Sequence, residues 1–70
     1  MVQWDIAANN GMAEVKQAFG ATDGEMENLR KQIEAWAKTH GDGEGHFPFK
    51  GTQVHANQRG GWIRQVTYGN

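Results

Sequence analysis

The stretch TDGEMENLRKQIEAWAKTH, residues 22–40, decides the fold because it predicts a long amphipathic helix. Its large apolar residues recur at intervals of three, four and three, which places them on one stripe of a helix. These residues are Met26, Leu29, Ile33 and Trp36. Thr22 and Glu25 match a capping box, in which each side chain accepts a hydrogen bond from a backbone N–H of the first turn. With Gly41 as the expected stop, the stretch predicts a helix over residues 23–39.

The sequence leaves open whether this helix continues backward. The same rhythm of apolar residues reaches back through Phe19 to Met12, as it does in a coiled-coil seam. Against a continuous helix, Gly20 costs about 1 kcal/mol in a helix interior, and Thr22 is suited to start a helix. We therefore expect a helical segment over residues 10–40 with a break or sharp kink near Gly20–Thr22.

The first eight residues predict a short N-terminal strand. VQWDI, residues 2–6, alternates apolar and polar side chains as a half-buried strand does. On the other side of the helical segment, GDGEGH over residues 41–46 predicts a glycine-rich connector. Seven of the ten glycines lie in residues 41–70, so the character of the chain changes here from helix to strands and turns.

Residues 47–69 predict a β-hairpin. Apolar and polar side chains alternate at 52–56 and again, with a change of phase, at 62–68. NQRG at 57–60 suits a four-residue loop with its glycine in a left-handed conformation. Pro48 restricts the segment around it to an edge or pre-strand position. Since an isolated hairpin is marginally stable, we expect it to pair with the N-terminal strand and to rest on the helix.

These elements predict a single small α+β domain over residues 1–70, in the order β-α(α)-β-β. The expected sheet is small, three-stranded and antiparallel or mixed, and it packs on one long, kinked or broken helix. Valine, isoleucine, leucine and phenylalanine together supply only 11 of the 70 residues. Because so small a core leaves the fold marginal, we expect a homodimer or a subunit of a larger assembly.

Composition excludes several classes of protein. The sequence has no cysteine, which excludes a disulfide framework, a thiolate nucleophile and a zinc finger. Apolar runs of at most three residues exclude a transmembrane helix, and the first residues lack the pattern of a signal peptide. We therefore expect a soluble cytoplasmic protein with no membrane partner. The net charge of −1 gives no strong electrostatic case for nucleic acid.

Chemistry-bearing residues gather in one place, the stretch HGDGEGH at residues 40–46. His40, Asp42, Glu44 and His46 are residue types that ligate metal ions. The stretch does not match an EF-hand loop, however, and it lacks two histidines at the spacing of one helix face. We therefore interpret it as a polar linker and expect no metal site and no cofactor. The sequence also has no serine and no catalytic pattern, so we expect no catalytic residues and no enzymatic activity.

Bases and aromatic residues interleave in the C-terminal part, which makes this part the candidate binding surface. Tryptophan and arginine combine a large contact area with directional bonding, so they are suited to a protein interface. The residues that we expect to contact a protein partner are Phe49, Arg59, Trp62, Arg64 and Tyr68. The alternative is a nucleic-acid-binding or regulatory protein, in which the same rings stack on unpaired bases. Three formal bases in this part are few for that role, so we do not favour it.

A second candidate surface is acidic and lies on the helix. Glu25, Glu27 and Glu34 would suit a basic partner. Residues 15–29 can be laid over a helix-turn-helix, but three acids at the start of the second helix oppose entry into a DNA groove. The sequence therefore predicts a small non-enzymatic binding protein. Chains of this size without cysteine are common among accessory and inhibitory proteins of phages and mobile elements.

Overall fold

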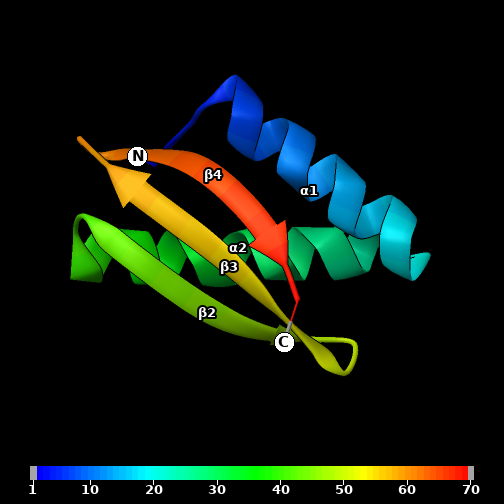
Figure 1. Ribbon diagram of the computed structural model, residues 1–70. Coiled ribbons are helices and arrows are strands. Elements are labelled where there is room, and N and C mark those ends of the chain that lie inside the picture. Colours follow the sequence, from blue (N-terminus) through cyan, green and yellow to red (C-terminus); the bar gives the residue numbers. More distant parts are fainter. Residues whose placement is uncertain (1, 70) are drawn as a thin grey trace.

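The computed structural model describes residues 2–69. The elements in chain order are β1 (Gln3–Trp4), α1 (Ile6–Phe19), α2 (Asp23–His40), β2 (Gly43–Phe49), β3 (Thr52–Arg59) and β4 (Trp62–Tyr68). The strands form one mixed sheet in the order β1-β4-β3-β2. β2, β3 and β4 are antiparallel neighbours, and β1 pairs in parallel with β4. Figure 1 shows α2 behind the sheet and α1 beside β4.

Helix α2 forms as the sequence predicts. The backbone N–H of Thr22 donates to Glu25 Oε1 at 2.8 Å, and the N–H of Glu25 donates to Thr22 Oγ1 at 3.1 Å, so both bonds of the capping box are present. Leu29, Ile33 and Ala37 form its buried stripe. Within residues 2–69, neither helix combines the length and the apolar character needed to cross a bilayer.

The predicted break in the helical segment is present and separates two helices. Gly20 adopts a left-handed conformation, with φ 57° and ψ 38°. Its N–H donates to Gln17 O, and the N–H of Ala21 donates to Lys16 O at 3.0 Å, which is the bonding pattern of a Schellman motif. The prediction of one segment over residues 10–40 is therefore corrected to two helices, the first of which begins four residues earlier.

The N-terminal strand is shorter than predicted, and Met1 lies outside the described residues. Only Gln3 and Trp4 pair with β4, since Asp5 already acts as the N-cap of α1. Asp5 has the extended backbone of an N-cap, but its side chain makes no capping hydrogen bond and instead accepts one from Arg64. The strand ends here because α1 packs along β4 and buries Ala8, and this packing outweighs the strand-like alternation. Ile6, expected in the strand, instead occupies the first position of the helix.

The sheet has four strands rather than the predicted three, because most of the expected connector at 41–46 belongs to β2. A Cβ added at Gly45 would lie 2.7 Å from Trp36 Cε2, so this glycine allows the strand to pack closely on α2. Pro48 lies on the edge strand, as predicted. The bounds of the loop predicted at 57–60 are wrong, because β3 continues to Arg59, but the positive φ predicted for Gly60 is confirmed. The turn consists of Gly60 and Gly61, both with positive φ, as a two-residue hairpin turn requires.

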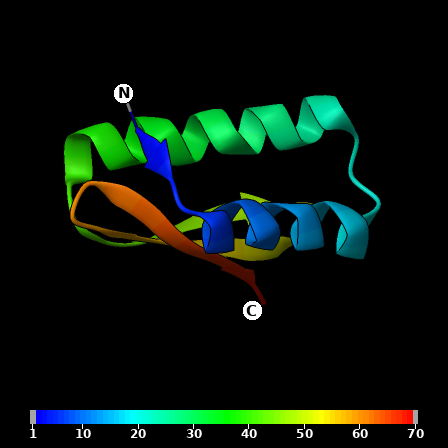
Figure 2. The same ribbon diagram turned by 90° about the horizontal axis from the view of Figure 1, so that it is seen from above.

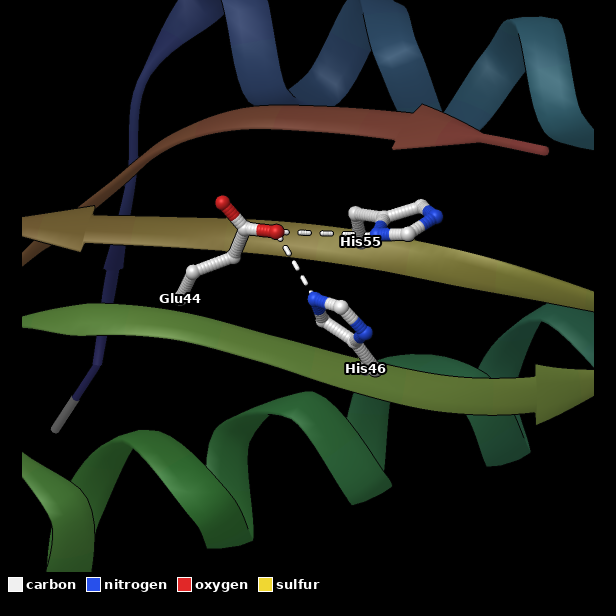
Figure 3. Close-up of side chains that lie close together, drawn as sticks. All are labelled: Glu44, His46 and His55. Atoms are coloured by element: carbon white, nitrogen blue, oxygen red, sulfur yellow. Dashed lines mark hydrogen bonds and ion pairs between the residues drawn. The ribbon is translucent and has the colours of Figure 1, made fainter. Parts of the chain in front are cut away.

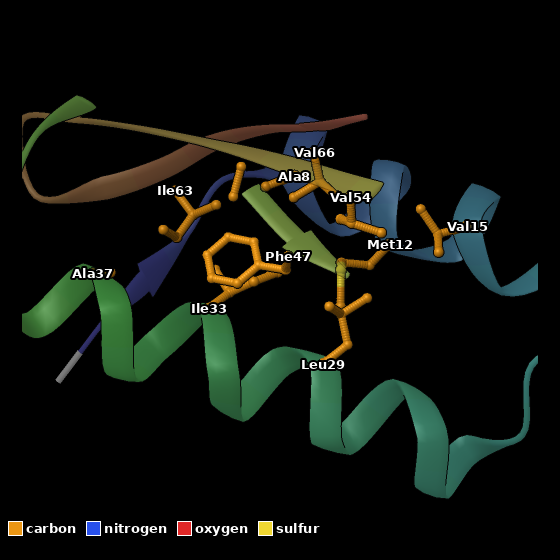
Figure 4. Close-up of a cluster of buried hydrophobic side chains, with 11 residues drawn as sticks. Ala8, Met12, Val15, Leu29, Ile33, Ala37, Phe47, Val54, Ile63 and Val66 are labelled. Carbon is orange, nitrogen blue, oxygen red and sulfur yellow. The ribbon is translucent and has the colours of Figure 1, made fainter. Parts of the chain in front are cut away.

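The core lies between the sheet and the two helices (Figure 4). α2 covers one face of the sheet, while α1 packs along β4 (Figure 2). The contact between α1 and β4 is close, because a Cβ added at Gly11 would lie 2.2 Å from the carbonyl oxygen of Val66. The cluster consists of Ala8, Met12, Val15, Leu29, Ile33, Ala37, Phe47, Val54, Ala56, Ile63 and Val66. Within residues 2–69, no helix covers the opposite face of the sheet.

Candidate binding surface on the open face of the sheet

We call the uncovered side of β2, β3 and β4 the open face. Successive side chains of a strand point to opposite sides, and Val54, Ala56 and Gln58 of β3 are buried toward the helices. The residues between them therefore point outward, together with their neighbours on β2 and β4. The open face includes Glu44, His46, Pro48, Gln53, His55, Asn57, Arg59, Trp62, Gln65 and Thr67, each of them exposed or half-buried.

One end of the open face holds an aromatic ring with an arginine fixed on it. Ile63 pairs with Gln58 and Gln65 with Asn57, so Arg64 is the extra residue of a β-bulge. Its guanidinium carbon lies 5.3 Å from the ring centre of Trp62, which is 39% exposed. We call these two residues the Trp62–Arg64 pair.

Two further bonds hold Arg64 in place. Its Nε donates to the carbonyl oxygen of Arg59 at 3.2 Å, and its Nη1 donates to Asp5 Oδ2 at 3.1 Å. The hydrogen bond from Arg64 is also the main reason why the pKa of Asp5 lies below its ordinary value. Both bonds are accessible to solvent, so their role is to set the orientation of the guanidinium rather than to stabilise the fold strongly.

Ile6 is an exposed residue that the sequence reasoning missed. It directly follows Asp5, the residue that bonds Arg64, and it is 77% exposed, more than Trp62 or Tyr68. No local pattern marks it, because the alternation over residues 2–6 predicts a strand and the Asp5 side chain makes no capping hydrogen bond.

The five predicted partner-binding residues do not form one surface. Arg59, Trp62 and Arg64 lie together, whereas Tyr68 lies at the far end of β4, about 20 Å away at 3.3 Å per residue. The rings of the other two aromatic residues, Tyr68 and Phe49, both contact the ring of Phe19 on α1. The ring centre of Phe19 lies 5.2 Å from that of Tyr68 and 6.2 Å from that of Phe49. Phe49 is half-buried and packs against the core.

Two of the three predicted acidic residues have partners inside the molecule. Glu25 accepts the capping-box bond and also bonds Lys50 Nζ at 2.9 Å. Glu34 accepts a hydrogen bond from Trp4 Nε1 at 2.8 Å. Glu27 lies exposed on α2. The acidic surface is therefore smaller than the sequence suggests.

Of the four polar residues of the stretch 40–46, only Glu44 and His46 lie together in the structure. His40 stacks on Trp36, with ring centres 5.0 Å apart. The carboxylate of Asp42 accepts hydrogen bonds from the N–H groups of Gly60 and Gly61, at 2.8 and 3.2 Å. These two N–H groups hold the pKa of Asp42 below its ordinary value. The other two residues, Glu44 and His46, belong to β2, and their side chains lie on the open face.

On the open face, Glu44 and His46 meet His55 of the neighbouring strand (Figure 3). Glu44 Oε2 lies 2.8 Å from His46 Nε2 and 3.6 Å from His55 Nδ1. The hydrogen bond with His46 is the main cause that lowers the pKa of Glu44. Beside this cluster is a shallow hollow of about 300 Å³, bordered by polar side chains of β3 and β4 that include Asn57 and Gln65. The sequence analysis did not place His55 beside Glu44 and His46, because their proximity depends on the pairing register of β2 and β3.

The fold defines a class, a small α+β protein with two helices and a four-stranded mixed sheet. No protein-family model matches the chain, and no curated protein or solved structure matches it. Function is therefore argued from the residues and their geometry.

Proposed function

We propose that the chain is a small, non-enzymatic binding protein that docks on a protein partner through the open face, at the end that carries the Trp62–Arg64 pair. The observation that carries this proposal is the guanidinium of Arg64, which is fixed over an exposed indole by Asp5 and the Arg59 carbonyl. The proposal concerns binding alone, because the sequence has neither serine nor cysteine to serve as a nucleophile.

Fixing these side chains before contact favours binding. Ordering a flexible interface side chain costs about 0.5–1.5 kcal/mol on association, and a side chain already ordered avoids that cost. Arg64 has three interactions that define its orientation in the free protein. Tryptophan and arginine are also the residue types most enriched among those that dominate interface energies.

The charges at this end indicate the chemistry of the partner. Arg59 and Arg64 are both exposed, and Trp62 adds exposed apolar surface. We infer a protein surface that presents an apolar side chain flanked by carboxylates. Nucleic acid is the less favoured occupant, because Glu44 lies on the same face and the chain as a whole carries a net charge of −1.

A cytoplasmic location belongs to the same proposal, with the cysteine-free composition as its support. So does a role as an accessory or inhibitory protein of a phage or mobile element, which the small size of the chain favours. Both depend on the identity of the partner and are tested together with it.

Affinity capture with a matched pair of charge reversals tests the proposal. Arg59→Glu changes the charge on the open face, and Lys31→Glu makes the same change on the exposed side of α2. We expect Arg59→Glu and Trp62→Ala each to reduce recovery of the partner from a lysate of the source cells by about tenfold or more, which corresponds to about 1.4 kcal/mol. Lys31→Glu leaves recovery unchanged.

Three outcomes contradict the proposal. The first is equal recovery by the wild type and Trp62→Ala, with circular dichroism showing both to be folded. The second is loss of recovery with Lys31→Glu. The third is recovery that depends on nuclease-sensitive material, together with steeply salt-dependent quenching of tryptophan fluorescence by a single-stranded oligonucleotide, which would favour nucleic acid.

A further inference from the structure

The register of β2 and β3 brings three metal-binding side chains to one point. Glu44 and His46 are two residues apart on one strand, so both point to the open face. His55 stands directly opposite His46 on the neighbouring strand, and the two ring centres are 4.4 Å apart. Two strands of the sheet thus present one carboxylate and two imidazoles without any contribution from a loop.

The distances between the ligand atoms suit a single small ion. Glu44 Oε2, His46 Nε2 and His55 Nδ1 all lie within 4.8 Å of one another. The two separations from the carboxylate oxygen are 2.8 and 3.6 Å. In a tetrahedral zinc site with bonds of about 2.0–2.1 Å, two ligand atoms are about 3.3 Å apart. Small rotations of the side chains therefore suffice to place all three atoms around one ion.

The hydrogen bond on the far side of His55 prepares its Nδ1 to be a ligand. His55 Nε2 lies 3.0 Å from the carbonyl oxygen of Gly69, which can only accept, so Nε2 carries the proton. The N–H of Gly69 in turn donates to Gln53 O at 3.0 Å, which ties this residue to β3. In the neutral ring, the lone pair of Nδ1 therefore points toward the carboxylate of Glu44. These two groups repel each other, and a cation bound between them would remove the repulsion. Histidines that bind metals characteristically donate their other N–H in this way.

We propose that Glu44, His46 and His55 bind one divalent transition-metal ion, with zinc as the reference, through Oε2, Nε2 and Nδ1. Two imidazoles and one carboxylate are ligands that zinc accepts, whereas calcium and magnesium prefer oxygen ligands throughout. Glu44 and His46 are exposed, so the fourth coordination position faces solvent and the adjoining hollow. This inference is independent of the proposed function, since none of the three ligands belongs to the Trp62–Arg64 pair.

Titration of the untagged protein with Zn²⁺ by calorimetry, and with Co²⁺ by visible absorption, tests the site. We expect one ion per chain, a Co²⁺ spectrum typical of tetrahedral nitrogen and oxygen ligands, and a higher Tm with Zn²⁺. His55→Gln and His46→Gln each weaken Zn²⁺ binding by more than about tenfold, because loss of even an outer-shell partner of a ligand typically costs about 10–100-fold. His40→Gln is the matched control, because His40 is close to Glu44 in the sequence but lies outside the cluster. We expect it to bind Zn²⁺ as the wild type does.

The proposal is overturned if the folded wild type shows no saturable Zn²⁺ binding. It is equally overturned if the double variant His46→Gln/His55→Gln binds as tightly as the wild type, or if His40→Gln loses the ion. Far-UV circular dichroism of each variant in the absence of metal separates loss of a ligand from loss of the fold. Two-dimensional NMR adds an independent readout, since Zn²⁺ should shift the ring resonances of His46 and His55 and leave those of His40 in place.

Discussion

Among the glycines, Gly11 is the one at which an added Cβ would be most crowded. A methyl group at this position would lie 2.2 Å from the backbone oxygen of Val66. We expect Gly11→Ala to lower the free energy of unfolding by about 1–3 kcal/mol, the usual effect of overpacking. This loss exceeds the gain of up to about 1 kcal/mol that alanine brings to a helix. Urea unfolding followed by tryptophan fluorescence measures the change.

Gly24 provides the control, because it is exposed on α2 and a Cβ there meets only Thr22 Oγ1, at 3.9 Å. Gly24→Ala should stabilise the protein by up to about 1 kcal/mol. Equal effects of the two substitutions would show that helix propensity rather than the α1–β4 contact decides the result.

Glu25 should make the stability depend on pH. The Thr22 N–H and then the Lys50 ammonium hold the pKa of Glu25 below its ordinary value of 4.5. A carboxyl with a lowered pKa stabilises the folded state above its ordinary pKa, and that contribution is lost as the pH falls through the lowered value. We expect the Tm of the wild type to exceed that of Glu25→Gln at about pH 6 and to converge with it at about pH 2. A Tm difference between the wild type and Glu25→Gln that stays constant across this pH range would refute the role assigned to the carboxylate.

At the scale of elements, the connection between α2 and β2 is tied to the β3–β4 turn by Asp42. Its carboxylate bonds the N–H groups of Gly60 and Gly61. We expect Asp42→Ala to lower the Tm and to speed amide hydrogen exchange at these two glycines by about tenfold, as loss of a charge-assisted hydrogen bond should. The exchange of β1 and α1 amides serves as the internal control. Unchanged exchange at both glycines would mean that the turn does not need this contact.

The helices were more predictable than the sheet. The apolar stripe and the capping box at Thr22 act locally, so α2 and the break before it follow from the sequence. β2 was missed because Gly43 and Gly45 are typical of a linker, and their role in packing against α2 appears only when the helix is in place. The extent of β1 was missed because a two-residue parallel pairing has no pattern of its own.

The candidate site was predictable only in part, for the same reason. Arg59, Trp62 and Arg64 surround one turn and remain neighbours in space. Tyr68 is separated from them by the length of β4, whereas Phe49 lies at the end of β2 and packs against the core. The cluster of Glu44, His46 and His55 also could not be predicted, because His55 is nine residues after His46 and lies on another strand. The pairing register that places the two histidines opposite each other cannot be obtained from their spacing alone.

At the scale of the whole molecule, the small core bears on self-association. Large apolar residues are few, and Ile6, Trp62 and Tyr68 remain exposed. β2 lies at the edge of the sheet, and Pro48 on it removes one backbone donor from strand pairing. The homodimer expected from the sequence stays a prediction. Size-exclusion chromatography with light scattering should show twice the chain mass at high micromolar concentration, and a monomer at that concentration would contradict it.

The proposed function requires the open face to be the surface that contacts the partner. Gln65 tests it most directly, because it is exposed and borders both the hollow beside His55 and the surface beside Arg59 and Arg64. A photo-crosslinking amino acid placed at Gln65 should form a covalent adduct with a partner protein in the source cells, whereas the same group at Lys31 on α2 should not. Adducts formed only from Lys31, or with nucleic acid instead of protein, would contradict the account, as would the absence of any adduct from Gln65.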